Sequence, residues 1–202
     1  MKESELYPSV EGFIKNKYNC FKTWREVGIE RIGYADIFGV CHKNSEKTEI
    51  ETICVEVKTR KRSTSAEFGQ AKGYSVFSHK VYFASLDEFN DEDAEIAKYL
   101  GIGLISITKE NSSFVCHEFL EPLTSIPIPK LLDLILERRK ILACQSCKVI
   151  QERSYTETIY DLDKIFAWTR NEVRKGKDLL IKNSEKMEFY CNKCARIRLN
   201  LV

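Results

Sequence analysis

The sequence predicts an α/β fold, in which a mixed β-sheet is flanked by helices and a small helical, zinc-ribbon-like region follows at the C-terminus. Short apolar runs alternate with amphipathic segments over the first 120 residues or so. The proline-rich stretch 121–129 then interrupts this pattern. Two CxxC pairs occur after it. We therefore expect a domain that contains the sheet at 1–121, a linker and helix at 122–143, and a cysteine-bearing region at 144–202.

The apolar periodicity of the first part predicts the order helix, three strands, helix, strand, helix and two strands. Residues 5–18 have apolar side chains at helical spacing, and Pro8 suits a first turn. Acidic residues open the last of the three helices and Gly101 closes it. The expected strands are 25–32, 34–43, 50–58, 80–85, 102–108 and 113–119, and the expected helices are 5–18, 63–77, 90–101, 130–142 and 161–176.

The composition is that of an ordinary globular protein. Hydrophobic residues make up 43% and charged residues 31% of the 202 positions. There is no apolar run long enough to span a bilayer, and the first residues do not resemble a signal peptide, so we expect a cytoplasmic protein without a membrane partner. A net charge of +2 is nearly balanced, so any contact with nucleic acid must be local, as at the basic run 58–62.

Two charges interrupt an otherwise apolar strand. Residues 50–58 resemble a strand buried on both faces, yet Glu56 and Lys58 lie within it, two positions apart and so on one face. Asp36 lies 20 positions earlier, inside the preceding apolar strand, and can reach that face. Two converging carboxylates suit a hard divalent cation, and an adjacent ammonium could hold a scissile phosphate or orient a water. These residues predict metal-assisted hydrolysis of a phosphodiester.

An acid followed by "ExK" on the next strand, with a glutamate-bearing helix before and a glutamine-bearing helix after, resembles the PD-(D/E)xK nuclease superfamily. The likeness is to its restriction-endonuclease-like and Holliday-junction-resolvase-like members, and it covers roughly residues 1–120. Ala35 stands where the motif has proline, a position that varies within the superfamily. The resemblance implies a restriction-endonuclease-like sheet and an Mg²⁺- or Mn²⁺-dependent DNA endonuclease, including structure-specific or resolvase-like forms.

The resemblance also implies roles for individual residues. Asp36 and Glu56 would be metal ligands, helped by the carbonyl of Val57, and Lys58 would be the catalytic lysine. The corresponding residues of the flanking helices are Glu5, with Glu11 as a less suitable substitute, and the pair Gln70 and Tyr74. This pair, in "QAKGY", resembles the QxxxY element of RecB-like nucleases, which faces the site and the DNA backbone.

Simpler interpretations stay open for each feature. Glu56 and Lys58 could be an edge-strand pair facing water, with Asp36 in a turn, and Gln70 and Tyr74 could be a solvated helix face. The basic run is either a solvated loop or a phosphate contact. Its members are Lys58, Arg60, Lys61 and Arg62.

The eight cysteines fall into two groups. Cys20, Cys41, Cys54 and Cys116 stand alone, and the last three lie in apolar strands, where cysteine acts as a small hydrophobe. The others form the two CxxC pairs and predict a structural zinc site. These ligands are Cys144, Cys147, Cys191 and Cys194.

Two alternatives to zinc stay open, namely four free thiols or an iron–sulfur cluster of the kind found in some RecB-like nucleases. Those clusters usually draw cysteines from both ends of the nuclease domain, whereas all four follow it here, which favours zinc. The 43 residues between the pairs exceed the spacing of about 15–20 common in zinc ribbons and are explained by an inserted helix.

A second class of function competes with the nuclease. A nuclease-like fold with structural zinc could bind nucleic acid or a protein without cutting. RNA as the substrate is not separable from DNA by sequence, although no aromatic RNA-stacking signature stands out. A homodimer is one arrangement that would cut both strands. The exposed surface of the helix at 130–142 could form its interface, and the apolar face of that helix could equally pack on the nuclease core.

Overall fold

The computed structural model describes residues 1–60, 64–144, 146–152 and 194. The chain divides into two compact units, each described here by itself. The first comprises Met1–Ser45 and Ile50–Ile135, and the second comprises Glu46–Glu49 and Leu136–Val202.

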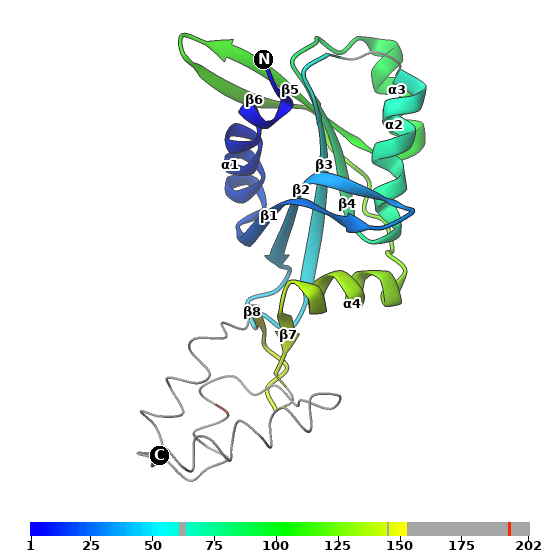
Figure 1. Ribbon diagram of the computed structural model, residues 1–202. Helices are drawn as coiled ribbons and strands as arrows, with labels where there is room; N and C mark the ends of the chain where they lie inside the picture. The colour runs from blue at the N-terminus through cyan, green and yellow to red at the C-terminus, as the bar shows by residue number, and fades with distance from the viewer. Residues whose placement is uncertain (61–63, 145, 153–193, 195–202) are drawn as a thin grey trace. The chain divides into compact units, whose positions relative to one another are not determined.

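The first unit is built on a six-stranded mixed sheet in the sequential order β1-β2-β3-β4-β5-β6 (Figure 1). The pairs β3–β4 and β4–β5 are parallel, and the other neighbours are antiparallel. This confirms the predicted α/β class with a mixed sheet. The strands are β1 Cys20–Ile29, β2 Gly33–His42, β3 Ile50–Lys58, β4 Lys80–Ser85, β5 Gly103–Glu110 and β6 Ser113–Leu120.

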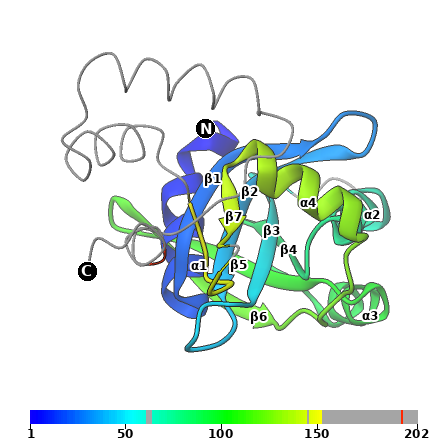
Figure 2. The same ribbon diagram turned by 90° about the horizontal axis from the view of Figure 1, so that it is seen from below.

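Helices cover both faces of this sheet. Because parallel neighbours need a crossover, one helix follows β3 and another follows β4. Both views place these two helices on one side of the sheet and α1 on the other (Figures 1 and 2). The helical elements are η1 Glu3–Glu5, α1 Tyr7–Tyr18, α2 Thr64–Gly73, η2 Tyr74–Val76 and α3 Asp91–Leu100.

The packing of α1 fixes the N-terminal residues against the sheet. Val10 and Ile14 are fully buried in one apolar cluster with Ile37 of β2 and Val55 of β3. Asn19 ends the helix in the left-handed conformation with φ 50°. This packing positions the first turn of α1 beside β2 and β3.

The predicted element order of the first 120 residues is confirmed, with one notable shift. The first strand begins at Cys20 and not at residue 25, because Phe21 and Trp24 pack against His42 and Phe38 of β2. The proline-rich stretch is tied to the sheet unit by its backbone, since the amide of Ser125 donates to the carbonyl of His79 at 2.7 Å.

The segment predicted as one helix over 130–142 is divided in the structure. Helix α4 spans Pro129–Arg138, and strand β7, Ile141–Ala143, then pairs antiparallel with β8, Ile150–Glu152. The helix predicted at 161–176 lies outside the described residues. None of the described helices is long and apolar enough to cross a membrane.

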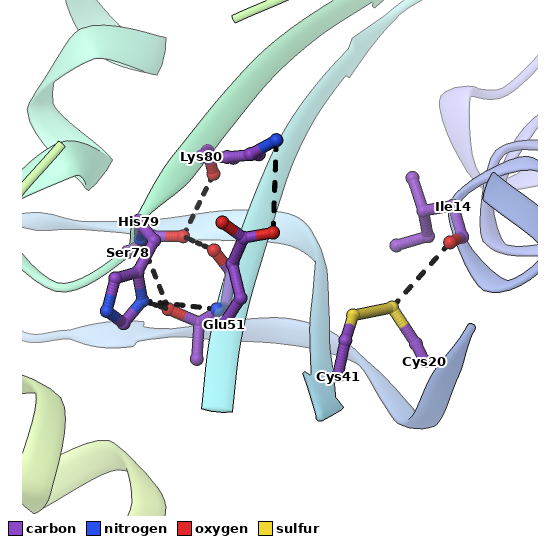
Figure 3. Close-up of a disulfide and its surroundings, with 8 residues drawn as sticks. Ile14, Cys20, Cys41, Glu51, Ser78, His79 and Lys80 are labelled. Atoms are coloured by element: carbon purple, nitrogen blue, oxygen red, sulfur yellow. Dashed lines mark hydrogen bonds and ion pairs between the residues drawn. A yellow bond between two sulfur atoms is a disulfide. The ribbon is translucent and has the colours of Figure 1, made fainter. Parts of the chain in front are cut away.

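Two cysteines predicted to stand alone are joined. A disulfide links Cys20 of β1 to Cys41 of β2, which face each other in the register of the two strands (Figure 3). Cys54 and Cys116 are free and act as apolar residues, as expected. Burial raises the pKa of the Cys116 thiol to about 11.

The residues before β4, Ser78 and His79, attach its beginning to β3 (Figure 3). The Ser78 hydroxyl donates to the carbonyl of Thr52, and Nδ1 of His79 lies 2.9 Å from the Thr52 hydroxyl. Burial lowers the pKa of His79. This histidine therefore helps to attach β4 to β3.

Candidate active site at the carboxyl end of β3

The site forms where β2 and β3 separate. Their backbone register runs from His42–Ile50 to Ile37–Val55. One residue further, Oδ2 of Asp36 accepts a hydrogen bond from the amide of Val57 at 2.7 Å. A side-chain carboxylate thus takes the place of a strand carbonyl, which fixes Asp36 in the fork between the two strands.

The second oxygen of Asp36 is held from the opposite direction. The hydroxyl of Tyr7, the first residue of α1, donates to Oδ1 at 2.5 Å. Burial, followed by the hydrogen bond to Asp36 and the charge of Asp36, raises the pKa of Tyr7 well above its usual value. Tyr7 therefore stays a donor, and both oxygens of Asp36 are oriented.

Glu56 is the most deeply buried carboxylate of the site, with 1% of its surface exposed. Its Oε1 accepts from Nε2 of Gln70 at 2.8 Å and lies 2.6 Å from Nζ of Lys58. Its Oε2 accepts from the Tyr74 hydroxyl at 2.6 Å. Burial and the charge of Asp36 raise the pKa of Glu56, although the bonds from Lys58 and Tyr74 act in the opposite direction.

Lys58 links this carboxylate to the N-terminus. Its ammonium lies 2.6 Å from Glu56 and 3.6 Å from Oε2 of Glu3, and 20% of its side chain is exposed. Burial by itself lowers the pKa of Lys58. The hydrogen bond to Glu56 and the negative charges of Glu56, Glu3 and Asp36 raise it by more, so the pKa of Lys58 lies above its usual value. The alternative in which Glu56 and Lys58 form an edge-strand pair facing water is therefore wrong, because β3 is a central strand and Glu56 is buried.

The two residues predicted from "QAKGY" also reach Glu56. Nε2 of Gln70 lies 3.1 Å from the Tyr74 hydroxyl, one helical turn away, and both side chains bond the Glu56 carboxylate. Tyr74 has none of its surface exposed, so it is not part of a solvated helix face. Burial, followed by the charge and hydrogen bond of Glu56, raises its pKa.

The first-helix glutamate is placed differently from the sequence prediction. Glu5 is exposed and accepts a hydrogen bond from the amide of Lys2 at 2.9 Å. Glu11 forms an ion pair with Arg25 at 2.7 Å. Glu3 is the acid of this segment that reaches Lys58. Sequence alone could not show which of these closely spaced glutamates points toward Lys58. Glu3 and Glu5 belong to η1, a short 3₁₀ turn, and the directions of its side chains depend on tertiary packing.

Sequence reasoning also missed Tyr7, whose hydroxyl orients Asp36. The only signal in the sequence was an aromatic residue at the start of the first helix, and such residues commonly belong to a hydrophobic core.

Of the basic run 58–62, Arg60 follows β3 and is exposed. Lys61 and Arg62 lie outside the described residues.

The donor set suits a divalent cation. Asp36 and Glu56 present two carboxylates from adjacent strands, and Glu3 lies 3.6 Å from Lys58. Oxygen ligands of this type are those that Mg²⁺ and Mn²⁺ prefer. A cation bound by Glu56 Oε1 must displace the ammonium that lies 2.6 Å from it.

A separate cluster lies in the second unit. Cys144 and Cys147 lie in the turn between β7 and β8, where the amide of Lys148 donates to the carbonyl of Cys144 at 2.9 Å. Their sulfurs and that of Cys194 all lie within 4.8 Å of one another, so they could hold a metal ion. The fourth predicted ligand, Cys191, lies outside the described residues.

Comparisons with known proteins do not assign a family. No family model matches the chain, and no curated protein matches it. A solved structure of the SPO1766 protein of unknown function from Silicibacter pomeroyi is 17% identical, with a TM-score of 0.46 over 68% of this chain and 82% of that chain. Such a likeness does not establish a shared function.

Proposed function

We propose that the protein is a metal-dependent nuclease of the PD-(D/E)xK type that hydrolyses phosphodiester bonds in DNA. The observation that carries the proposal is the convergence of Asp36, Glu56 and Lys58 at the end of β3, with Gln70 and Tyr74 bonded to Glu56. A buried strand tolerates this much charge only if it is paired and hydrogen-bonded, and functional sites are where such arrangements concentrate. The restriction-endonuclease-like fold is part of the same proposal.

Asp36 and Glu56 would hold Mg²⁺ or Mn²⁺, with the carbonyl of Val57 as a further oxygen donor. When bound, the ion would polarise the phosphate and lower the pKa of the attacking water. Tyr7 keeps Asp36 in place through Oδ1, and the Val57 amide does so through Oδ2. Both contacts orient the carboxylate before any substrate arrives.

Lys58 acts as a fixed positive charge in this scheme. Since Glu56, Glu3 and Asp36 raise its pKa, the amine is protonated at neutral pH and is unsuited to abstracting a proton from water. Released from Glu56 by a bound cation, the ammonium can contact a phosphate oxygen and stabilise the negative charge that develops there. Arg60, exposed two residues later, extends the positive surface toward the DNA backbone.

The cysteine cluster is proposed as a structural zinc site. Cys144, Cys147 and Cys194 would be three of its ligands, and Cys191 completes the second CxxC pair. Four thiolates form a closed tetrahedral site with no open position for chemistry. The zinc would stabilise the second unit and leave catalysis to the first.

The nuclease proposal is tested by cleavage of a labelled panel comprising linear duplex, single strand, flap and four-way junction DNA, together with duplex RNA. Each substrate is incubated with Mg²⁺, with Mn²⁺ or without added divalent ion. The proteins compared are the wild type, Lys58→Met, and Lys98→Met as a control that removes an exposed lysine of α3.

We expect metal-dependent cleavage of DNA that Lys58→Met lacks and Lys98→Met retains. Equal cleavage by wild type and Lys58→Met would refute the assigned role of Lys58. Binding of DNA without cleavage in either metal would refute the nuclease and favour a binding module. Preferential cleavage of RNA would change the substrate class.

A further inference from the structure

The hairpin between β1 and β2 presents exposed side chains close to the candidate site. Tyr34 is 55% exposed and Ile32 is 37% exposed, and Arg31 between the strands is also exposed. Both views show this hairpin reaching toward the side of the sheet that carries α2 (Figures 1 and 2). Among the described residues, the Tyr34 ring packs on no other aromatic ring.

The hairpin is attached to the site through its backbone. The carbonyl of Tyr34 lies 2.9 Å from the Tyr74 hydroxyl, which in turn lies 2.6 Å from Oε2 of Glu56. The neighbouring Gly33 has φ 136°, and a β-carbon there would come within 3.1 Å of the Tyr74 ring. A side chain at position 33 would therefore strain this contact, and the glycine lets the hairpin approach closely. The side chain of Tyr34 is not used in this attachment.

The strand geometry places Tyr34 next to Asp36. Residues two apart on a strand share a face and are separated by about 7 Å, whereas the intervening Ala35 is fully buried on the other face. The backbone of Tyr34 therefore lies roughly one nucleotide step from that of Asp36, one of the two carboxylates proposed to bind the metal. An exposed ring on this face, in a hairpin that also exposes Arg31 and Ile32, is suited to the flat face of a base.

We propose that Tyr34 is a stacking platform for an unpaired nucleobase next to the scissile phosphate. The preferred substrate class is thus DNA with unpaired nucleotides at the cleavage point, such as a single strand or a flap. This inference rests on the proposed nuclease function. A continuous duplex offers no free base face to Tyr34, since its bases stack on each other, and unstacking one costs free energy. Stacking on a tyrosine accepts every base, so no sequence preference is implied.

Base stacking is measured first without cleavage. An oligonucleotide carries the fluorescent base 2-aminopurine either in an unpaired segment or inside a duplex, and no divalent ion is added. The proteins are the wild type, Tyr34→Ala, Tyr34→Phe, and Tyr99→Ala, which removes a 91% exposed tyrosine of α3 as a control. We expect the wild type, Tyr34→Phe and Tyr99→Ala to quench the unpaired base, and Tyr34→Ala to quench it much less.

Cleavage rates with Mg²⁺ are measured on the same proteins. Tyr34→Ala should cleave substrates with unpaired nucleotides about 5- to 150-fold more slowly, the range expected for loss of one aromatic stacking contact. Tyr34→Phe and Tyr99→Ala should stay near the wild-type rate, and any cleavage of intact duplex should be unchanged by all three substitutions.

The outcomes separate this inference from the proposal beneath it. Metal-dependent cleavage with equal rates and equal quenching for Tyr34→Ala and wild type would overturn the role of Tyr34 and leave the nuclease intact. If the wild type cleaves no substrate, the nuclease proposal fails, and the quenching experiment still decides whether Tyr34 holds a base. A faster wild-type reaction on intact duplex than on a flap or single strand would also overturn the inferred substrate class.

Discussion

Removal of the Tyr74 hydroxyl would test the hydrogen-bond network around Glu56. This hydroxyl lies 2.6 Å from Oε2 of Glu56, and both residues are almost completely buried. The Tyr74→Phe substitution keeps the ring and removes one oxygen, so it creates little empty volume. A hydrogen bond to a charged group contributes about 1.5–3 kcal/mol. We therefore expect the free energy of unfolding to fall by about 2 kcal/mol at neutral pH.

The size of this loss should depend on pH. Burial and the charge of Asp36 raise the folded-state pKa of Glu56, while the Tyr74 bond opposes that rise. For a group whose folded-state pKa is raised, stability is lost as the pH rises through that pKa. Without the hydroxyl the pKa of Glu56 rises further, so the variant loses more stability on ionisation. The difference between the proteins should be largest near neutral pH and should shrink as acid protonates Glu56 in both.

The assay is urea unfolding without added divalent ion. Trp24 lies in β1, so its fluorescence in a Trp168→Phe background reports on the sheet unit. Tyr74→Phe is compared in the wild-type and Glu56→Gln backgrounds. In the Glu56→Gln background the Tyr74 hydroxyl donates to a neutral amide oxygen, and the expected loss of unfolding free energy falls to about 1 kcal/mol. An equal loss in both backgrounds, independent of pH, would show that the Tyr74 hydroxyl does not stabilise the Glu56 carboxylate.

Three further experiments test the candidate active site and the cysteine cluster. Lys58→Met should tighten Mn²⁺ binding in calorimetry while abolishing cleavage, since the ammonium 2.6 Å from Glu56 competes with the cation; weaker binding would contradict this. Glu3→Gln should reduce the cleavage rate, because Glu3 lies 3.6 Å from Lys58. Glu5→Gln should not, because Glu5 accepts a hydrogen bond from the backbone of Lys2. Equal rates for the two variants would refute the choice of Glu3. Cys194→Ser should lower the zinc content of purified protein, measured with a colorimetric chelator, and an unchanged content would exclude this cluster as the zinc site.

The central part of the candidate site was predictable from the sequence. Strand alternation placed Glu56 and Lys58 on one face, and an acid inside the preceding apolar strand pointed to Asp36. These are local signals, because a charge in a buried strand conflicts with its surroundings and must be compensated. Gln70 and Tyr74 followed from their spacing of one helical turn and from the resemblance to nuclease motifs.

The residues that support this centre were not predictable in the same way. Glu3 and Tyr7 reach the site because α1 packs on the sheet, through Val10 and Ile14, and the angle of that packing is not encoded in periodicity. The Cys20–Cys41 disulfide depends on the register of β1 and β2, which a predicted first strand starting at residue 25 could not give. Tertiary packing decided these contacts after local pattern had set the strands.

The most direct test of the account is a crystal structure of the protein grown with Mn²⁺, with anomalous difference density used to locate the ion. The account predicts a peak about 2 Å from carboxylate oxygens of both Asp36 and Glu56. It also predicts that Nζ of Lys58 has moved away from Glu56 Oε1. The absence of a peak between these carboxylates, with Lys58 still paired to Glu56, would contradict the proposed metal site.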